Sequence, residues 1–264
     1  MPAIFAHRGL SSRFPEMTRA AYQAAIEWAA ATGSELGLEC DVHFAADDQL
    51  VCLHDLTLHR TAAIPSRAID LTVAQLKQID FGSWLQVDPA EDQRELITLA
   101  ELLSMTMAAR ANGVAVSLVI ETKHPNPRSL DIEDRLAEML TEIGWDAAGS
   151  PVRVISFSLA ALERLGQLLP ALPRSLLVEF DLEPWRDGRL PEGVHVVGPE
   201  LELLRADPGF VARARAQGNE VHVWTVNHPD DIRFCQDLGV TGLTTDYPDL
   251  VTEVLATPVL AEAS

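Results

Sequence analysis

The stretch VAVSLVIETK, residues 114–123, is an almost unbroken apolar run that ends in three polar residues. A helical pattern follows over residues 130–143 and ends at Gly144. A second apolar run at 152–156 and a second helical pattern at 159–169 come next. Apolar runs of this kind are typical of parallel strands buried on both faces, and each intervening stretch is long enough to connect two such strands. The order therefore predicts a parallel sheet covered by helices.

The same alternation runs through the rest of the chain. Further helical patterns occupy residues 19–31, 207–217 and 229–238, and the first of these can be capped by Thr18 and ended by Gly33. The candidate strands are residues 3–6, 38–44, 50–54, 114–120, 152–156, 175–179, 194–197, 221–226 and 242–245. Repeated over 264 residues, this order predicts one α/β domain, a (β/α)8 barrel of the TIM type spanning residues 1–264.

Nine candidate strands are one more than such a barrel needs. Residues 38–44 and 50–54 are too close in sequence for the crossover that parallel neighbours require, so we expect a hairpin with one arm outside the barrel. The stretch 56–107 shows no clear strand, one short helical pattern at 72–79 and an acidic patch at 88–95. It has too few apolar residues for a core of its own, so we expect an insertion within the barrel domain.

The charge of the chain excludes several classes of partner. It has 20 Lys and Arg against 39 Asp and Glu, a formal net charge of −19. Binding of nucleic acid or of an anionic membrane surface needs a basic face, which this chain lacks. No apolar run has the length of a membrane-spanning helix, and the first residues lack the pattern of a secretory signal. We therefore expect a cytoplasmic protein with no nucleic-acid partner and no stable membrane insertion.

Functional residues of a parallel barrel lie at the carboxyl ends of its strands. Glu39 and Asp41 alternate along one predicted strand, so their side chains point the same way. Two such carboxylates repel each other unless one is protonated or a cation neutralises them, and hard divalent ions such as Mg²⁺ and Ca²⁺ prefer oxygen ligands. Glu121, at the end of another strand, is the third candidate ligand. The alternative is a solvated strand end with ordinary acids, but three acids at neighbouring strand ends favour a metal site.

Two histidines and two cations lie beside these acids in the predicted barrel. His7 and His54 end two different strands, where they can serve as acid and base on opposite sides of a reacting centre. A single histidine at a strand end is more often structural, but its pairing with a carboxylate cluster favours catalysis. Arg8 and Lys123 suit the binding of phosphate oxygens. Their alternative role is a structural ion pair with the acidic residues.

Other candidate residues have weaker support. Trp224 is either a wall of the pocket or part of the core. Ser156 lies outside any G-x-S-x-G motif, Cys40 and Cys52 have no clear case as nucleophiles, and there is no glycine-rich phosphate loop. Six histidines do not end a strand beside the carboxylate cluster and are expected to be structural: His43, His59, His124, His195, His222 and His228. Of these, the structural role has the weakest support for His43, because it lies two residues beyond Asp41 and should face the same side.

Taken in order, the motifs at the strand ends resemble those of the glycerophosphodiester phosphodiesterase family, in its bacterial cytoplasmic type. They run from residue 7 to about residue 250. One position departs from the family pattern, which normally has Asn where this chain has Met17. The motifs are His7-Arg8-Gly9, Pro15-Glu16-Met17-Thr18, Glu39-Cys40-Asp41-Val42, His54-Asp55, Leu58-His59-Arg60-Thr61, Glu121-Thr122-Lys123, Ser156-Phe157, Trp224-Thr225-Val226-Asn227 and Thr245-Asp246-Tyr247-Pro248-Asp249.

The resemblance implies an enzyme and its substrates. The reaction would be metal-dependent hydrolysis of glycerophosphodiesters, such as glycerophosphocholine and glycerophosphoethanolamine, to sn-glycerol 3-phosphate and an alcohol. The nucleophile would be water or the glycerol 2-hydroxyl. Two alternatives are a lysophospholipase D-type activity on acylated substrates and a catalytically inactive barrel that binds phosphodiesters. The sequence leaves open whether the chain is a monomer or a homodimer.

The resemblance also implies a role for each site residue. One divalent cation would bind, with Mg²⁺ favoured and Ca²⁺ as the alternative. We take His54 as the general acid, although no residue pattern separates it from His7. The metal ligands would be Glu39, Asp41 and Glu121, the acid and base His7 and His54, and the phosphate contacts Arg8 and Lys123.

Overall fold

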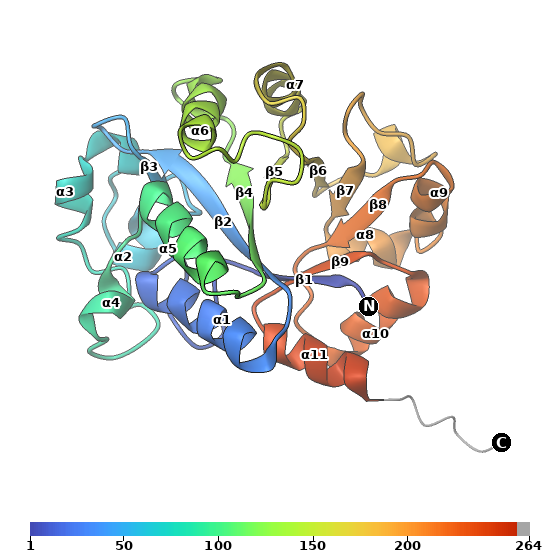
Figure 1. Cartoon of the computed structure of the whole chain (residues 1–264), viewed down its shortest axis with the longest axis horizontal. Coiled ribbons are helices and arrows are strands. Elements are labelled where there is room, and N and C mark those ends of the chain that lie inside the picture. The colour runs from blue at the N-terminus through green and yellow to red at the C-terminus, as the bar shows by residue number, and fades with distance from the viewer. Residues whose placement is uncertain (258–264) are drawn as a thin grey trace.

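A computed structural model describes residues 1–257, and these contain a closed barrel of eight parallel strands (Figure 1). The pairing of the first strand with both the second and the last closes the barrel. In order around it the strands are β1 (Ala3–Ala6), β2 (Leu36–Phe44), β4 (Val116–Thr122), β5 (Val152–Ser156), β6 (Arg174–Val178), β7 (Val196–Pro199), β8 (Glu220–Val223) and β9 (Gly242–Thr245). The predicted (β/α)8 barrel is confirmed.

The extra strand is β3 (Leu50–Cys52), which pairs with β2 in the antiparallel direction. It has no barrel neighbour on its other side in the strand order. The predicted hairpin is therefore present, with its second arm outside the barrel. Its position matters for the site, because His54 follows β3 directly and is carried back toward the carboxyl end of the barrel.

The helices cover the outside of the barrel, and their ends follow local chemistry. Thr18 caps the first helix by accepting a hydrogen bond from the Ala21 amide at 3.3 Å, and Gly33 ends that helix at a φ of 68°. Among the described residues, no helix is long and apolar enough to cross a membrane. The covering helices are α1 (Arg19–Thr32), α5 (Leu99–Ala111), α6 (Asp131–Glu142), α7 (Leu159–Leu168), α8 (Leu201–Ala206), α9 (Phe210–Ala216), α10 (Pro229–Leu238) and α11 (Pro248–Ala256).

Helix α5 lies partly within the stretch 56–107, where we expected an insertion. Thr98 and Glu101 form a capping box at its start, and the helix packs against β4, β3 and α1. It therefore belongs to the helical layer of the barrel. A capping box before an apolar run is a recognisable sequence signal. The apolar residues of this helix are spread around all its faces, so the usual helical periodicity is weak.

The segment between β3 and α5 contains only short helices, which group beside β3 at one side of the barrel (Figure 1). They are α2 (His59–Ala62), η1 (Ala68–Asp70), α3 (Val73–Leu76) and α4 (Glu91–Arg94). Its buried apolar side chains, such as Leu76 and Phe81, form one cluster with Val51 and Leu53 of the hairpin. This shared cluster supports our proposal that the segment is an insertion in a single barrel domain.

The inside of the barrel is filled below its carboxyl end. Phe5, Val119, Ile155 and Leu177 point inward from four strands and form one buried cluster. Gly37 makes room for them, because a Cβ atom there would lie 2.3 Å from the Phe5 ring. This apolar layer is the floor on which the polar residues of the strand ends stand.

Candidate active site

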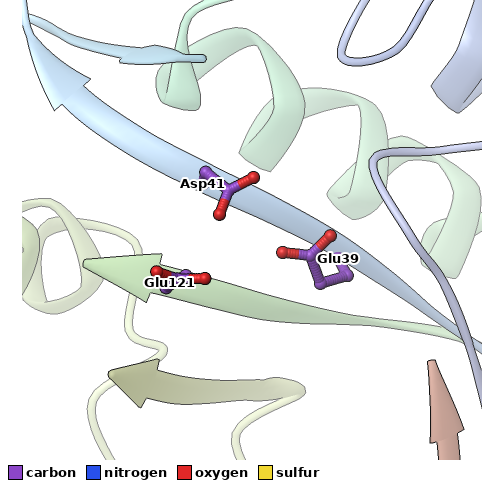
Figure 2. Close-up of side chains that lie close together, drawn as sticks. All are labelled: Glu39, Asp41 and Glu121. Atoms are coloured by element: carbon purple, nitrogen blue, oxygen red, sulfur yellow. The ribbon is translucent and has the colours of Figure 1, made fainter. Parts of the chain in front are cut away.

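Three carboxylates meet at the carboxyl end of the barrel, as the sequence predicts. Glu39 and Asp41 project from the same face of β2, and Glu121 projects from β4, where it pairs in register with Asp41 (Figure 2). One oxygen from each lies within 4.8 Å of the other two. The side chains are buried, with residue exposures of 3%, 1% and 6% respectively. The alternation of β2 and its pairing with β4 are therefore sufficient to build the cluster.

The electrostatics of this cluster call for a cation. Burial, followed by repulsion from Asp41, raises the pKa of Glu39 to about 7 and the pKa of Glu121 well above its usual range. Burial also acts to raise the pKa of Asp41, but the charges of Lys123 and Arg8 outweigh it and leave that pKa lowered. Asp41 Oδ2 is buried without a hydrogen-bond partner. Three convergent carboxylates, one with an oxygen that accepts no hydrogen bond, fit a hard divalent cation such as Mg²⁺ or Ca²⁺.

Arg8 and Lys123 lie directly against the carboxylates. Lys123 Nζ is 2.7 Å from both Asp41 Oδ1 and Glu121 Oε1. Arg8 donates its backbone N–H to Glu39 Oε2 at 2.9 Å and places Nε 3.4 Å from Asp41 Oδ2. The ion pairs considered from the sequence are thus present, and both cations also line the cavity in front of the cluster.

His7 is oriented by a carboxylate that sequence reasoning left without a role. It follows β1, and its Nδ1–H donates to Asp246 Oδ1 at 2.7 Å. Asp246, which follows β9, also accepts hydrogen bonds from Ser11 Oγ at 2.9 Å and Asn227 Nδ2 at 2.6 Å. Burial acts to raise the pKa of Asp246, but the hydrogen bonds that it accepts outweigh burial and leave the pKa lowered. The carboxylate is therefore ionised. The sequence signal that could have identified Asp246 is its position directly after a strand, within the motif Thr245-Asp246-Tyr247-Pro248-Asp249.

His54 is oriented in the same way from the other side of the cavity. Its Nδ1–H donates to Asp55 Oδ1 at 2.7 Å. Asp55 is held in turn by Arg60 through Nε at 2.8 Å and Nη2 at 3.1 Å. In both histidines Nδ1 is thus occupied by a carboxylate, and Nε2 is the nitrogen left for a ligand. Burial, together with the charges of Lys123 and Arg8, lowers the pKa of His54.

Arg60 connects the two sides of this arrangement. Besides Asp55 it binds Glu16 through Nη1 at 2.8 Å and Nη2 at 2.6 Å, and Glu16 accepts a hydrogen bond from Arg8 Nη1 at 3.0 Å. Its guanidinium also lies 5.6 Å from the centre of the Trp84 ring. The segment after β3 therefore supplies a cation that holds the carboxylate behind His54 and the carboxylate behind Arg8. Sequence reasoning did not assign a role to Arg60, because its contact with Glu16 joins residues 44 positions apart.

The residues face one cavity of about 730 Å³. The carboxylates, both histidines and both cations line one side of it. Trp224 lies in the wall opposite, where its Nε1–H donates to the Gly198 carbonyl at 2.7 Å and Phe157 packs edge-on at 5.6 Å. Trp224 therefore borders both the cavity and the apolar layer below it.

Several other predicted residues have structural contacts. His43 Nε2 is 3.2 Å from the His54 carbonyl, so this buried ring supports the backbone of the site. His124 lines the cavity, but its Nε2 is 2.9 Å from the fully buried Glu133. Met17 has a φ of 57°, a left-handed conformation that asparagine tolerates better than methionine. Its side chain is buried in the core, and its N–H donates to the Arg8 carbonyl at 3.0 Å.

A barrel whose mouth combines a carboxylate cluster, paired histidines and two cations has the groups that hydrolysis of a phosphodiester uses. Residues 7–250 match the glycerophosphoryl diester phosphodiesterase family, and the chain belongs to that family. The family and the enzyme class predicted from the sequence, a glycerophosphodiester phosphodiesterase, are confirmed.

Similar proteins cover nearly the whole chain. A Mycobacterium tuberculosis protein named probable glycerophosphodiester phosphodiesterase 1 is 35% identical over 254 residues, which cover 94% of this chain and 90% of that protein. The glycerophosphodiester phosphodiesterase of Bacillus subtilis is 30% identical, with coverages of 94% and 85%. Among solved structures, an Oleispira antarctica phosphodiesterase has the same fold, with a TM-score of 0.80, 24% identity and coverages of 97% and 98%. The cytoplasmic location and the oligomeric state stay predictions.

The carboxylate cluster makes a direct binding prediction. We expect calorimetric titration with Mg²⁺ or Ca²⁺ to show one ion bound per chain. Glu121→Gln keeps the shape of the side chain but removes a charge, so it should weaken binding at least tenfold. The matched control is Glu142→Gln on α6, an exposed acid remote from the cavity, which should bind the ion as the wild type does. Equal affinities in the two variants would show that the cluster does not hold the ion.

The Arg60 contacts predict an effect on His54 at a distance. Arg60→Lys loses the fork that binds Asp55 and Glu16 together, so kcat should fall roughly tenfold to a hundredfold through misplacement of these groups. Weaker compensation of Asp55 should also raise the pKa of His54, which a pH profile of kcat/KM reports. Arg67→Lys, an exposed cation of the same segment whose partner is Asp70, is the control. A pH profile unchanged in Arg60→Lys would limit Arg60 to a structural role.

Proposed function

We propose that this enzyme hydrolyses glycerophosphodiesters such as glycerophosphocholine and glycerophosphoethanolamine, releasing sn-glycerol 3-phosphate and an alcohol, with one bound divalent cation. The observation that carries the proposal is the convergence of three buried carboxylates and two histidine–carboxylate pairs on one cavity. Two further facts support it. The relatives are named for this activity, and the Oleispira antarctica phosphodiesterase is described in complex with the product sn-glycerol-3-phosphate.

The residues that would hold the cation are Glu39, Asp41 and Glu121. A bound divalent cation supplies neutralisation of phosphate charge and lowers the pKa of a hydroxyl that contacts it. Mg²⁺ is our first choice and Ca²⁺ the alternative, because the oxygen donors suit both ions.

Arg8 and Lys123 are placed to bind the phosphate. Both contact Asp41 and line the cavity, so a phosphate in front of the cluster meets two cations that are already ordered. Arg8 is held by Glu16 on its far side, which keeps its guanidinium in one orientation. Ordered cations bind an anion without the entropy cost of fixing long side chains at that moment. The net charge of the chain opposes an anionic substrate at long range, so this local site has to provide the capture.

The two histidines would move the protons. One accepts the proton of the attacking hydroxyl at Nε2, and the other donates a proton to the departing alkoxide from the same atom. Asp246 and Asp55 fix the tautomers and stabilise the charged imidazolium forms. Burial and the charges of Lys123 and Arg8 lower the pKa of His54, which favours the neutral form that a base needs. We therefore propose His54 as the base and His7 as the acid, the reverse of our sequence-based assignment.

The nucleophile is water or the substrate's own 2-hydroxyl. The second path forms a cyclic phosphate that water then opens. Trapping of a cyclic 1,2-phosphate by rapid quench would identify the second path. Hydrolysis without any such species would identify water.

A second candidate substrate class has some structural support. Phe180 and Leu159 line the cavity and are 86% and 47% exposed, a combination that suits an acyl chain at the mouth. Comparison of glycerophosphocholine with lysophosphatidylcholine separates the two activities. We favour the deacylated substrate because the cavity interior around the carboxylates is polar. An inactive barrel is disfavoured because every proposed ligand and proton-transfer position is retained.

The two histidines make a kinetic prediction. His7→Ala and His54→Ala should each lower kcat for glycerophosphocholine by roughly 10²–10⁴-fold, the range for loss of a general acid or base. A p-nitrophenyl diester has an acidic leaving group that needs little protonation. His7→Ala should therefore recover much of its activity on that diester, and His54→Ala should not.

The outcomes divide the possibilities clearly. Recovery in His54→Ala instead would restore the assignment made from the sequence. His195→Ala, which replaces a histidine outside the cavity, is the control for the substitution itself. If both active-site variants turn over glycerophosphocholine like the wild type, the two-histidine mechanism is wrong.

A further inference from the structure

The cavity has a second chemical half that the reaction above does not use. In the strand order, β6, β7 and β8 lie across the barrel from the β2–β4 pair that carries the carboxylate cluster. Aromatic side chains gather on this wall: Trp224 after β8, and Phe180 and Trp185 after β6. Phe157, after the neighbouring β5, reaches the wall by packing edge-on against Trp224 at 5.6 Å. Phe157 is 37% exposed and Phe180 is 86% exposed. Exposed aromatic rings around a cavity mouth are a binding surface rather than part of a core.

An acidic side chain stands in the same wall. Leu177 of β6 belongs to the apolar cluster inside the barrel, whereas Leu176 and Val178 pack with the outer helices. Side chains alternate along a strand, so Glu179, two residues after Leu177, continues the inner face at the carboxyl end, where it lines the cavity. Glu179 has no hydrogen-bonded or ion-pair partner for its side chain among the described residues. Asp181 lines the same mouth two residues later, and its Oδ1 accepts the Glu183 amide at 2.8 Å. The wall therefore carries a carboxylate with no counter-ion.

The register places the backbones of Glu179 and Trp224 at one level of the barrel. Val178 pairs with Pro199 on β7, and the next residue, Glu200, pairs with Trp224. Glu179 and Trp224 are thus at one level of the barrel, two strand spacings or about 10 Å apart. The indole reaches from that level toward the barrel floor, where its Nε1–H donates to the carbonyl of Gly198, the partner of Leu177 in the register. A compact cation between them would contact the aromatic face on one side and the carboxylate on the other.

The charges around the cavity favour a cation on this wall alone. On the opposite side, three carboxylates would be outweighed by a divalent ion together with Arg8 and Lys123. That side would repel an ammonium group and suit the uncharged glycerol hydroxyls. The other inward cation, Arg153, lies near Ser175 at the opposite end of β6, about 13 Å along the strand from Glu179.

We infer that Glu179, Trp224 and Phe157 form a subsite for the alcohol part of the diester that selects a cationic ammonium head group. The inference rests on the proposed function, since it assumes a phosphodiester held between the two walls. Aromatic faces attract ammonium and quaternary ammonium groups, and a nearby carboxylate adds to this attraction when water is excluded. Among glycerophosphodiesters, we thus expect the enzyme to prefer those whose alcohol is an amino alcohol to those whose alcohol is glycerol.

The test compares two substrates of different head-group charge. The wild type should have a kcat/KM for glycerophosphocholine roughly tenfold above that for glycerophosphoglycerol, a typical value for one desolvated cation contact. Glu179→Gln should bring this ratio close to one, because kcat/KM should fall much more for glycerophosphocholine than for glycerophosphoglycerol. Phe157→Leu should reduce the ratio about threefold, because loss of one aromatic contact weakens cation binding less than loss of the Glu179 charge does. Glu183→Gln, on the same loop but outside the cavity, is the matched control and should keep the wild-type ratio.

A binding measurement keeps this inference separate from the proposed function. Tetramethylammonium should quench the tryptophan fluorescence of the wild type in a saturable way, and Glu179→Gln should weaken that binding. Saturable binding with no turnover of either diester would support the subsite and overturn the proposed function. Equal wild-type kcat/KM values for the two diesters, or equal losses on both in Glu179→Gln, would overturn the subsite and leave the proposed function standing.

Discussion

The burial of three like charges in one place is the constraint on which the rest of this site depends. Glu39, Asp41 and Glu121 are held together by the pairing of β2 with β4, so they cannot move apart to relieve their repulsion. Removing carboxylates from water costs free energy unless cations compensate them. Arg8 and Lys123 supply part of that compensation, but Oδ2 of Asp41 still accepts no hydrogen bond. We propose that a divalent ion completes the balance of charge.

The surrounding residues can be understood as consequences of that cluster. Arg8 is held against it by Glu16, Glu16 by Arg60, and Arg60 also holds Asp55 behind His54. The segment after β3 thus orients His54, the proposed base, through the same ion-pair network that orients Arg8, the proposed phosphate contact. Asp246, which follows the last strand, orients His7 through a hydrogen bond. The pairing of β1 with β9 that closes the barrel therefore also brings these two residues together.

The sequence predicted those parts of the structure that follow from local periodicity. The two-residue spacing of Glu39 and Asp41 and the short connection before β3 were sufficient for the cluster and the hairpin. Contacts between distant segments were harder to predict. Asp246 orients His7 from 239 residues away, and Arg60 binds Glu16 from 44 residues away, whereas the pair of His54 with Asp55 is local. Strand ends also shifted, because apolar content does not mark where barrel pairing stops. Residues 114–120 were predicted as a strand, but the pairing runs to Thr122 and includes Glu121.

The central claim is that the buried carboxylates hold a divalent cation that the hydrolysis of glycerophosphodiesters requires. The most direct measurement is turnover of glycerophosphocholine by protein treated with EDTA and then dialysed, before and after addition of Mg²⁺ or Ca²⁺. The account predicts no release of sn-glycerol 3-phosphate without the ion and restored release with it, and no restoration in Glu121→Gln at the same concentration. Full turnover by the metal-free wild type would contradict it.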